Sequence, residues 1–139
     1  MLIKMSELKL LQTFKNQIIN FLDELIEQFP SEAEFVIIRI FVKDQIPLGD
    51  VLGRFIKECL PHHEEIKNKN EAFFLESDII VNALGGSKLG TEVMDKLKSL
   101  WRSERLDHED REMIWKWMGL FFQIAQTYKT KYGSVAGWE

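Results

Sequence analysis

The chain has 139 residues with a formal net charge of −4, and 45% of its residues are hydrophobic and 29% charged. This length suffices for one domain that buries a sizeable core. Acidic and basic residues are interleaved, which argues against broad attraction to nucleic-acid phosphates or anionic lipid surfaces. Three prolines and eight glycines leave little room for a loop-rich all-β fold. We therefore expect one globular domain that does not bind a membrane and for which nucleic acid is a less favoured partner than protein.

Cysteine usage and the N-terminal sequence indicate a compartment. Cys59 is the single cysteine, so no disulfide can form within the chain, and a reducing environment is expected. The first residues, MLIKMSELK, lack the apolar core of a signal peptide. No apolar run approaches the length of roughly 20 residues that spans a bilayer. We predict an intracellular protein that does not associate with a membrane.

The first predicted helix runs from a cap at Ser6 to about Gln28,. Apolar residues recur along it at spacings of three and four and cover a wide arc. They are Leu8, Leu11, Phe14, Ile18, Phe21, Leu22, Leu25, Ile26 and Phe29. Proline disfavours helical geometry in the residue before it, so Pro30 should end this helix.

The segment Phe35–Val42, FVIIRIFV, is the most ambiguous part of the sequence. Its β-branched residues are typical of a buried strand, whereas Ser31 and Glu34 have the spacing of a helix capping box. We predict a helix and keep the strand as the alternative, because no second clear strand is found. Such a helix would be apolar nearly all round and therefore deeply buried, with Arg39 in need of a carboxylate or carbonyl partner.

Shorter helices are predicted in the middle of the chain. One opens near Asp50 and ends at Pro61, which also starts a mostly polar helix,. Another extends over residues 70–84, although its last part, IIVNAL, also fits a short strand. Gly85 and Gly86 should end that helix, and a further helix should run over residues 91–101.

The last predicted helix lies within Leu106–Tyr132. Asp107 is suited to cap its start and Gly133 its end. Its apolar residues span an arc of roughly 180°, wider than the stripe of roughly 100° on a surface helix, which predicts contacts on two sides. They are Ile114, Trp115, Trp117, Met118, Phe121, Phe122, Ile124, Ala125 and Tyr128. We expect residues 1–132 to form a single helical domain and residues 133–139 a flexible tail.

These aromatic residues allow two interpretations. Rings at helical spacing usually pack in the core. Trp115 and Phe122 lie at one edge of the arc, and together with Trp101 in the preceding helix they are candidates for contact with another chain.

Two motifs resemble chemical sites without fitting them. Cys59, His62 and His63 form C-x-x-H-H, but adjacent histidines on a helix point about 100° apart, whereas zinc needs three or four converging ligands. Cys59 also belongs to an apolar face, where burial raises the pKa of a thiol. Residues 85–91, GGSKLGT, look like a phosphate loop, but Lys88 lies between Gly85 and Gly90, whereas the phosphate-binding lysine should follow the second motif glycine. We expect no metal, no cofactor and no catalytic residue.

A basic cluster around Trp101 is the basis for an alternative function. It consists of Lys96, Lys98, Arg102 and Arg105. A tryptophan within a basic groove could stack the bases of a single-stranded nucleic acid. Acidic residues such as Glu92 and Asp95 dilute the cluster, so a solvated helix face paired with acids is the favoured interpretation.

Four segments carry a resemblance to known proteins. They are FLDELIEQFP at 21–30, KDQIP at 43–47, LWRSERLD at 100–107 and IWKW at 114–117. In these segments the chain resembles small uncharacterised proteins encoded by large DNA viruses of algae and protists. The resemblance implies a virus-encoded protein that acts in the host cytoplasm or viral factory, or is packaged in the virion. It implies no activity and no site residues.

The sequence thus predicts an all-α fold, a single compact bundle of about six helices in which the first and last helices pack together. The leading functional hypothesis is a non-enzymatic protein-interaction or structural module that binds a protein partner or a second copy of itself. A nucleic-acid-associated accessory factor that uses the segment around Trp101 is the alternative. An enzyme acting through residues 85–91 comes third.

Overall fold

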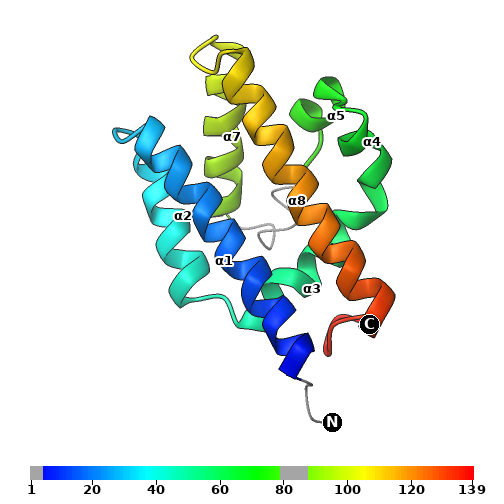
Figure 1. Cartoon of the computed structure of the whole chain (residues 1–139). Coiled ribbons are helices and arrows are strands. Elements are labelled where there is room, and N and C mark those ends of the chain that lie inside the picture. Colours follow the sequence, from blue (N-terminus) through cyan, green and yellow to red (C-terminus); the bar gives the residue numbers. More distant parts are fainter. Residues whose placement is uncertain (1–4, 79–87) are drawn as a thin grey trace.

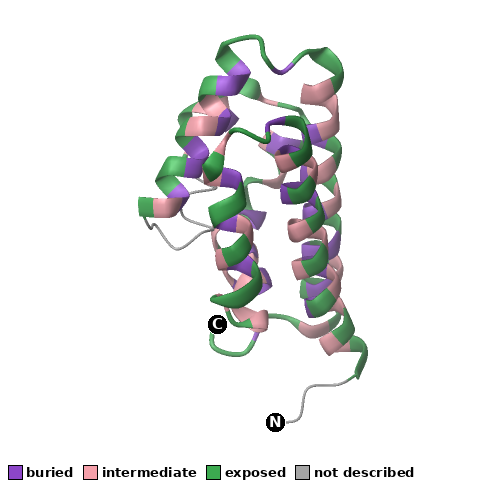
Figure 2. Ribbon diagram, turned by 90° about the vertical axis from the view of Figure 1, so that its left-hand side faces the viewer, coloured by how far each residue is buried: buried purple, intermediate pink, exposed green. Residues whose placement is uncertain are grey.

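The computed structural model describes residues 5–78 and 88–139, which fold into packed helices with no strand among them (Figure 1). In chain order the elements are α1 (Met5–Gln28), α2 (Ala33–Asp44), α3 (Leu48–Glu58), the short 3₁₀ helix η1 (Leu60–His62), α4 (His63–Lys67), α5 (Glu71–Glu76), α7 (Lys88–Arg102) and α8 (His108–Tyr132). The predicted all-α bundle is confirmed. Figure 2 shows buried residues on the sides of helices that face one another and exposed residues on the outside.

The long helix α8 is the centre of the fold, as its wide apolar arc predicts. It packs against α1, α3, α4 and η1. Its contact with α1 confirms the predicted pairing of the first and last helices, with the rings of Phe21 and Phe121 centred 5.8 Å apart. The indole of Trp117 donates a hydrogen bond of 2.7 Å to Glu24 across the same contact. These aromatic pairs fix α1 on one side of α8, while the shorter helices cover another side.

The predicted ends of α8 are also confirmed. The side chain of Asp107 accepts a hydrogen bond from the amide of Asp110 at 2.8 Å, and the Asp110 side chain accepts one from the amide of Asp107 at 3.2 Å. This reciprocal pair satisfies backbone donors that a helix start leaves without partners. Gly133 follows the last turn with φ of 77°, a conformation that favours glycine,.

The ambiguous segment Phe35–Val42 is helical, so the preferred prediction is confirmed, but its predicted deep burial is wrong. Helix α2 buries Phe35, Ile38 and Val42 and leaves Val36, Ile37 and Ile40 exposed, at 38%, 50% and 51% of their full accessible surface. The reason is position, because α2 lies at the edge of the bundle and packs mainly against α1 and α7 (Figure 1).

The local contacts of α2 differ partly from the prediction. Arg39 has the carboxylate partner it was expected to need, Asp23 of α1. The predicted capping box is not formed, since α2 begins at Ala33 after Glu32, whose side chain makes no cap hydrogen bond. At the other end of the helix, the ammonium group of Lys15 donates to the carbonyl oxygen of Lys43 at 3.0 Å.

The middle of the chain follows the predicted order with different boundaries. Helix α5 ends at Glu76 and Ser77 is extended, so the predicted helix over residues 70–84 is shorter at its end. The IIVNAL segment and the two glycines after it, residues 79–86, lie outside the described residues. Helix α7 begins at Lys88, three residues before the predicted cap at Thr91.

Residues 133–139 fold back onto α3, although the sequence predicts a flexible tail. Val135 is buried. The indole of Trp138 donates a hydrogen bond of 3.1 Å to Asp50, and the guanidinium of Arg54 lies 4.6 Å from the centre of its ring. The close approach requires a glycine on α3, since a Cβ atom at Gly53 would come within 2.2 Å of the indole.

Candidate functional site

The three aromatic residues predicted as interaction anchors are buried within the chain. Trp101, Trp115 and Phe122 retain 1%, 8% and 3% of their accessible surface. Trp101 and Trp115 form a cluster with Phe74, in which the ring centres lie 5.4 to 5.7 Å apart. These rings join α5, α7 and α8 to one another. The alternative that they are core residues is the one the structure supports.

The basic cluster around Trp101 lacks an exposed tryptophan ring on which a base could stack, because Trp101 is buried. Lys96 and Arg105 both pair with the carboxylate of Glu32, at 3.0 and 3.1 Å. Their hydrogen bonds lower the pKa of Glu32, and the bond to Glu32 in turn raises the pKa of Lys96. The ammonium group of Lys98 lies 3.5 Å from a backbone carbonyl, that of Ser77. With the Trp101 ring covered and two cations engaged by a carboxylate, the arrangement serves to join α7 to α2.

The C-x-x-H-H motif is divided among separate contacts. Cys59 is buried, and burial raises the pKa of its thiol well above the ordinary value,. His62 lies against Phe73 with ring centres 5.2 Å apart, and His63 lies against Phe122 at 5.6 Å. The two imidazoles thus pack on different rings. No group of three or more metal-ligating side chains converges within residues 5–78 and 88–139.

The predicted phosphate-loop candidate, residues 85–91, lies partly outside the described residues. Its described part, Lys88 to Thr91, belongs to the first turn of α7. The ammonium group of Lys88 lies 4.0 Å from the carboxylate of Glu92, one turn further along the same helix. This pair is typical of a helix surface.

A surface that the sequence analysis did not identify lies on the outside of α2. Val36, Ile37 and Ile40 form it, and we call it the α2 apolar face. Among the described residues, the only other large hydrophobic side chain in the exposed class is Met5, at the start of α1. Neighbouring aliphatic side chains exposed together on one face often mark an interaction site, whereas single exposed residues are ordinary.

Ion pairs on both flanks hold α2 so that this face points outward. On the side of α1, Arg39 pairs with Asp23. On the side of α7, Glu34 lies 4.0 Å from Lys96. The sequence did contain a signal for the exposed face: FVIIRIFV has more apolar residues than one inward side of a helix can hold, so some must point elsewhere.

Comparison with known proteins does not indicate a function, so the functional assignment rests on the geometry described above. No protein-family model, no curated protein and no solved structure matches the chain. Across the described residues, no helix combines the length and the apolar character needed to cross a membrane.

Proposed function

We propose that the chain is a non-enzymatic protein-interaction module that docks through the α2 apolar face. The observation that carries this proposal is the exposure of Val36, Ile37 and Ile40 side by side on a helix whose flanks are fixed by ion pairs. Burying aliphatic surface against a partner contributes about 25 cal/mol per Å². These side chains contain no polar atoms, so their burial leaves no hydrogen-bonding group without a partner.

The most direct form of this function is weak self-association. Two copies of α2 packed antiparallel about a two-fold axis would place Ile37 of each copy against Ile40 of the other, which makes the face complementary to itself. A stable interface buries about 800 Å² per partner, more than three half-exposed aliphatic side chains supply. A transient dimer that forms at high protein concentration is therefore the expected state. If the chain is virus-encoded, as its resemblance implies, such a module would act in the infected cell or the particle.

The test is light scattering after size-exclusion chromatography over a wide range of protein concentrations. We expect the average mass of the wild-type chain to rise with concentration and that of an Ile37→Glu/Ile40→Lys variant to stay at the monomer value. Both new side chains favour helix and leave the net charge unchanged, so α2 should still fold. The matched control is Asn16→Glu/Asn20→Lys, which adds the same charges at exposed positions of α1.

Three outcomes would contradict the proposal at different levels. A wild-type chain that is monomeric at every concentration would remove self-association. A photo-crosslinker at position 37 that then captures no protein, while far-UV circular dichroism shows an intact fold, would remove the interaction module itself. Equal association of the wild type and the α2 variant would place the contact on another surface.

A further inference from the structure

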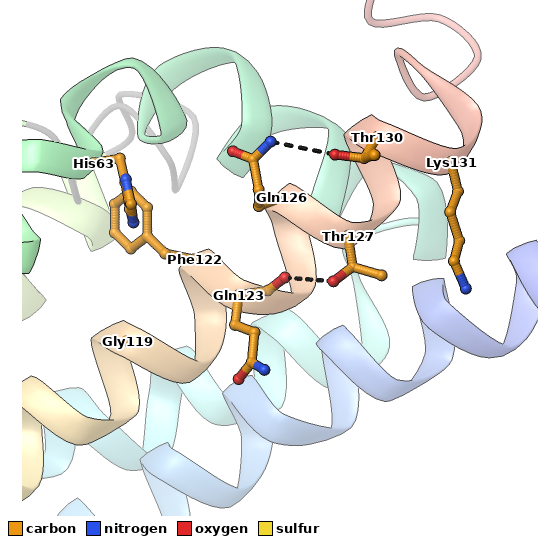
Figure 3. Close-up of a pocket in the computed structure, with 8 residues that line it drawn as sticks. All are labelled: His63, Gly119, Phe122, Gln123, Gln126, Thr127, Thr130 and Lys131. Atoms are coloured by element: carbon orange, nitrogen blue, oxygen red, sulfur yellow. Dashed lines mark hydrogen bonds between the residues drawn. The ribbon is translucent and has the colours of Figure 1, made fainter.

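A groove on the outside of α8 is separate from the α2 apolar face (Figure 3). Two adjoining hollows of about 440 and 240 Å³ form it and share His63, Gly119 and Phe122. Lys67 and Lys69 line one end, and Lys131 lines the other. We call this the α8 groove. Along α8 it extends from Trp115 to Lys131, about 24 Å at the rise of an α-helix, which matches about seven residues of an extended chain.

The floor of the groove combines apolar and uncharged polar groups. The imidazole of His63 lies over the ring of Phe122, with ring centres 5.6 Å apart. Beyond them Gln123, Gln126 and Thr130 line the same hollow (Figure 3). The primary amides of glutamine both donate and accept hydrogen bonds, as the backbone of an extended peptide requires from its binding site. Such a floor fits a polypeptide with an apolar side chain that packs against the imidazole of His63, because Phe122 beneath it is buried.

The charged residues that line the groove are all basic. Its lining contains three lysines and a histidine, and no aspartate or glutamate, although the whole chain is acidic. Lys69 pairs with Glu112, whereas Lys67 and Lys131 form no ion pair with any other described residue. From Gly119 to the end of α8 the sequence contains no carboxylate. The two ends of the groove therefore present cations to whatever binds between them.

A second hollow on α8 shows that a basic lining is not common to all hollows of the molecule. It has a similar volume, about 460 Å³, and lies where the last turns of α1 meet the first turns of α8. Its lining includes Glu24, Glu27, Glu109 and Asp110, and no basic residue. The charges of the molecule are thus segregated along α8, with acids at the start of the helix and cations beside the groove.

Gly119 provides an independent indication of an outside ligand. It lies in the middle of α8, where glycine costs about 1 kcal/mol relative to alanine. A Cβ atom at this position would meet nothing within 4 Å, so no packing contact among the described residues requires glycine. Gly53 is the opposite case, since the indole of Trp138 occupies the space of its missing side chain. The open backbone at Gly119 suits the close approach of another main chain.

We propose that the α8 groove binds an extended acidic segment of a partner protein. Carboxylates of the segment pair with Lys67 and Lys131 at the two ends. Its main chain crosses α8 over Gly119, and one apolar side chain packs against the imidazole of His63, which lies over the buried ring of Phe122. This site is independent of the α2 apolar face, because α2 packs against α1 and α7 while the groove lies between α8 and α4 (Figure 1). Either proposal can fail without the other.

The test begins with a random dodecapeptide library displayed on phage and selected against the wild-type chain. We expect the enriched peptides to contain an excess of Asp and Glu. A labelled peptide from the enriched set is then titrated by fluorescence anisotropy against the wild type and a Gly119→Gln variant. The new side chain fills the floor of the groove, so we expect binding to weaken at least about tenfold.

Gly119→Gln also separates a blocked site from a damaged fold. Because the side chain enters open space and removes a helical glycine, the melting temperature of the variant should rise by a few degrees. Loss of binding in a more stable protein cannot come from unfolding. If the variant is instead less stable than the wild type, Gly119→Ala replaces it in the stability measurement, since its smaller side chain tests the open space alone.

The contribution of charge is tested with matched pairs of lysines on the same protein. Lys67→Gln/Lys131→Gln should weaken binding and reduce its dependence on salt. Lys116→Gln/Lys129→Gln removes the same charge from exposed positions of α8 that do not line the groove, and it should have a smaller effect. Enrichment of no peptide family, enrichment of peptides that are not acidic, or equal binding to the Gly119→Gln variant would overturn the proposal.

Discussion

Helices α8 and α2 both carry apolar residues around half their circumference or more, yet their neighbours cover them to different extents. Neighbouring helices cover α8 on several sides, and every aromatic residue proposed as an anchor on it is buried. Helix α2 packs mainly against α1 and α7 and keeps three aliphatic side chains exposed. The width of an apolar arc thus indicates how many neighbours a helix can accept, and not how many its own chain supplies.

The chemistry of the two apolar surfaces differs as well. On α8 two aromatic side chains have polar atoms that are satisfied inside the chain: the indole of Trp117 donates to Glu24, and the hydroxyl of Tyr128 donates to Glu7 at 2.6 Å. These bonds restrict each ring to one place. The aliphatic residues of α2 need no polar partner, so the same surface tolerates water and a second protein.

The largest expected effect on stability follows the removal of a buried aromatic ring. Trp115→Ala removes a buried side chain that contacts Phe74 and Trp101, and we expect the free energy of unfolding to fall by about 3–5 kcal/mol. Ile37→Ala is the matched substitution on α2 and should change it by less than about 0.5 kcal/mol, because that side chain is half exposed,.

Urea unfolding followed by far-UV circular dichroism measures both variants. The measurement should be made at low protein concentration, where any weak dimer is dissociated. Similar losses of stability in the two variants would mean that the α2 apolar face is covered within the chain, and the contrast with α8 would fail.

Covered and open surfaces can also be compared at two glycines. Gly53→Ala places a Cβ atom within 2.2 Å of the Trp138 indole, so either Trp138 shifts or α3 is strained. We expect a loss of about 1–3 kcal/mol, typical of overpacking. Gly119→Ala, with open space around it, should have the opposite sign.

A truncated chain tests the cause of the Gly53 effect. If residues 135–139 are removed, Trp138 no longer occupies the space beside Gly53, and Gly53→Ala should become neutral or stabilising because alanine favours helix. A loss of the same size with and without the tail would show that the tail does not pack on α3 in solution. Thermal unfolding is measured for the wild type, for Gly53→Ala, for the truncated chain and for the truncated chain with Gly53→Ala. These four stabilities form a double-mutant cycle.

How much of this could be predicted depends on the range of the contacts. The caps of α8 and its pairing with α1 follow from local residue types and from the matching wide arcs of the two helices. The docking of Trp138 on Gly53 joins positions far apart in the chain, and no local pattern indicates it. The pairing of Lys96 with Glu32 likewise depends on how α7 meets α2, so a cluster that looks basic in sequence is partly neutralised in the fold.

The smallest expected effect concerns the flank that holds α2 against α7. Glu32 has a lowered pKa because it accepts hydrogen bonds from Lys96 and Arg105. A carboxyl group with a lower pKa in the folded state stabilises the protein above its unfolded pKa of about 4.3, and this stabilisation is lost as pH falls through the folded pKa. Glu32→Gln should therefore reduce stability slightly at about pH 7, and the difference from wild type should shrink at acidic pH.

The control for that measurement is Glu27→Gln, an exposed carboxylate on α1 that lines the acidic hollow and forms no ion pair with another described residue. It removes the same charge without releasing Lys96 or Arg105. We expect the Glu32 effect to decrease at high salt, since both cations are accessible to solvent,. If Glu32→Gln and Glu27→Gln give the same dependence on pH, the ion pairs do not hold α2 in place. The orientation of its apolar face would then depend on the buried side chains Phe35, Ile38 and Val42 and on the pair between Arg39 and Asp23.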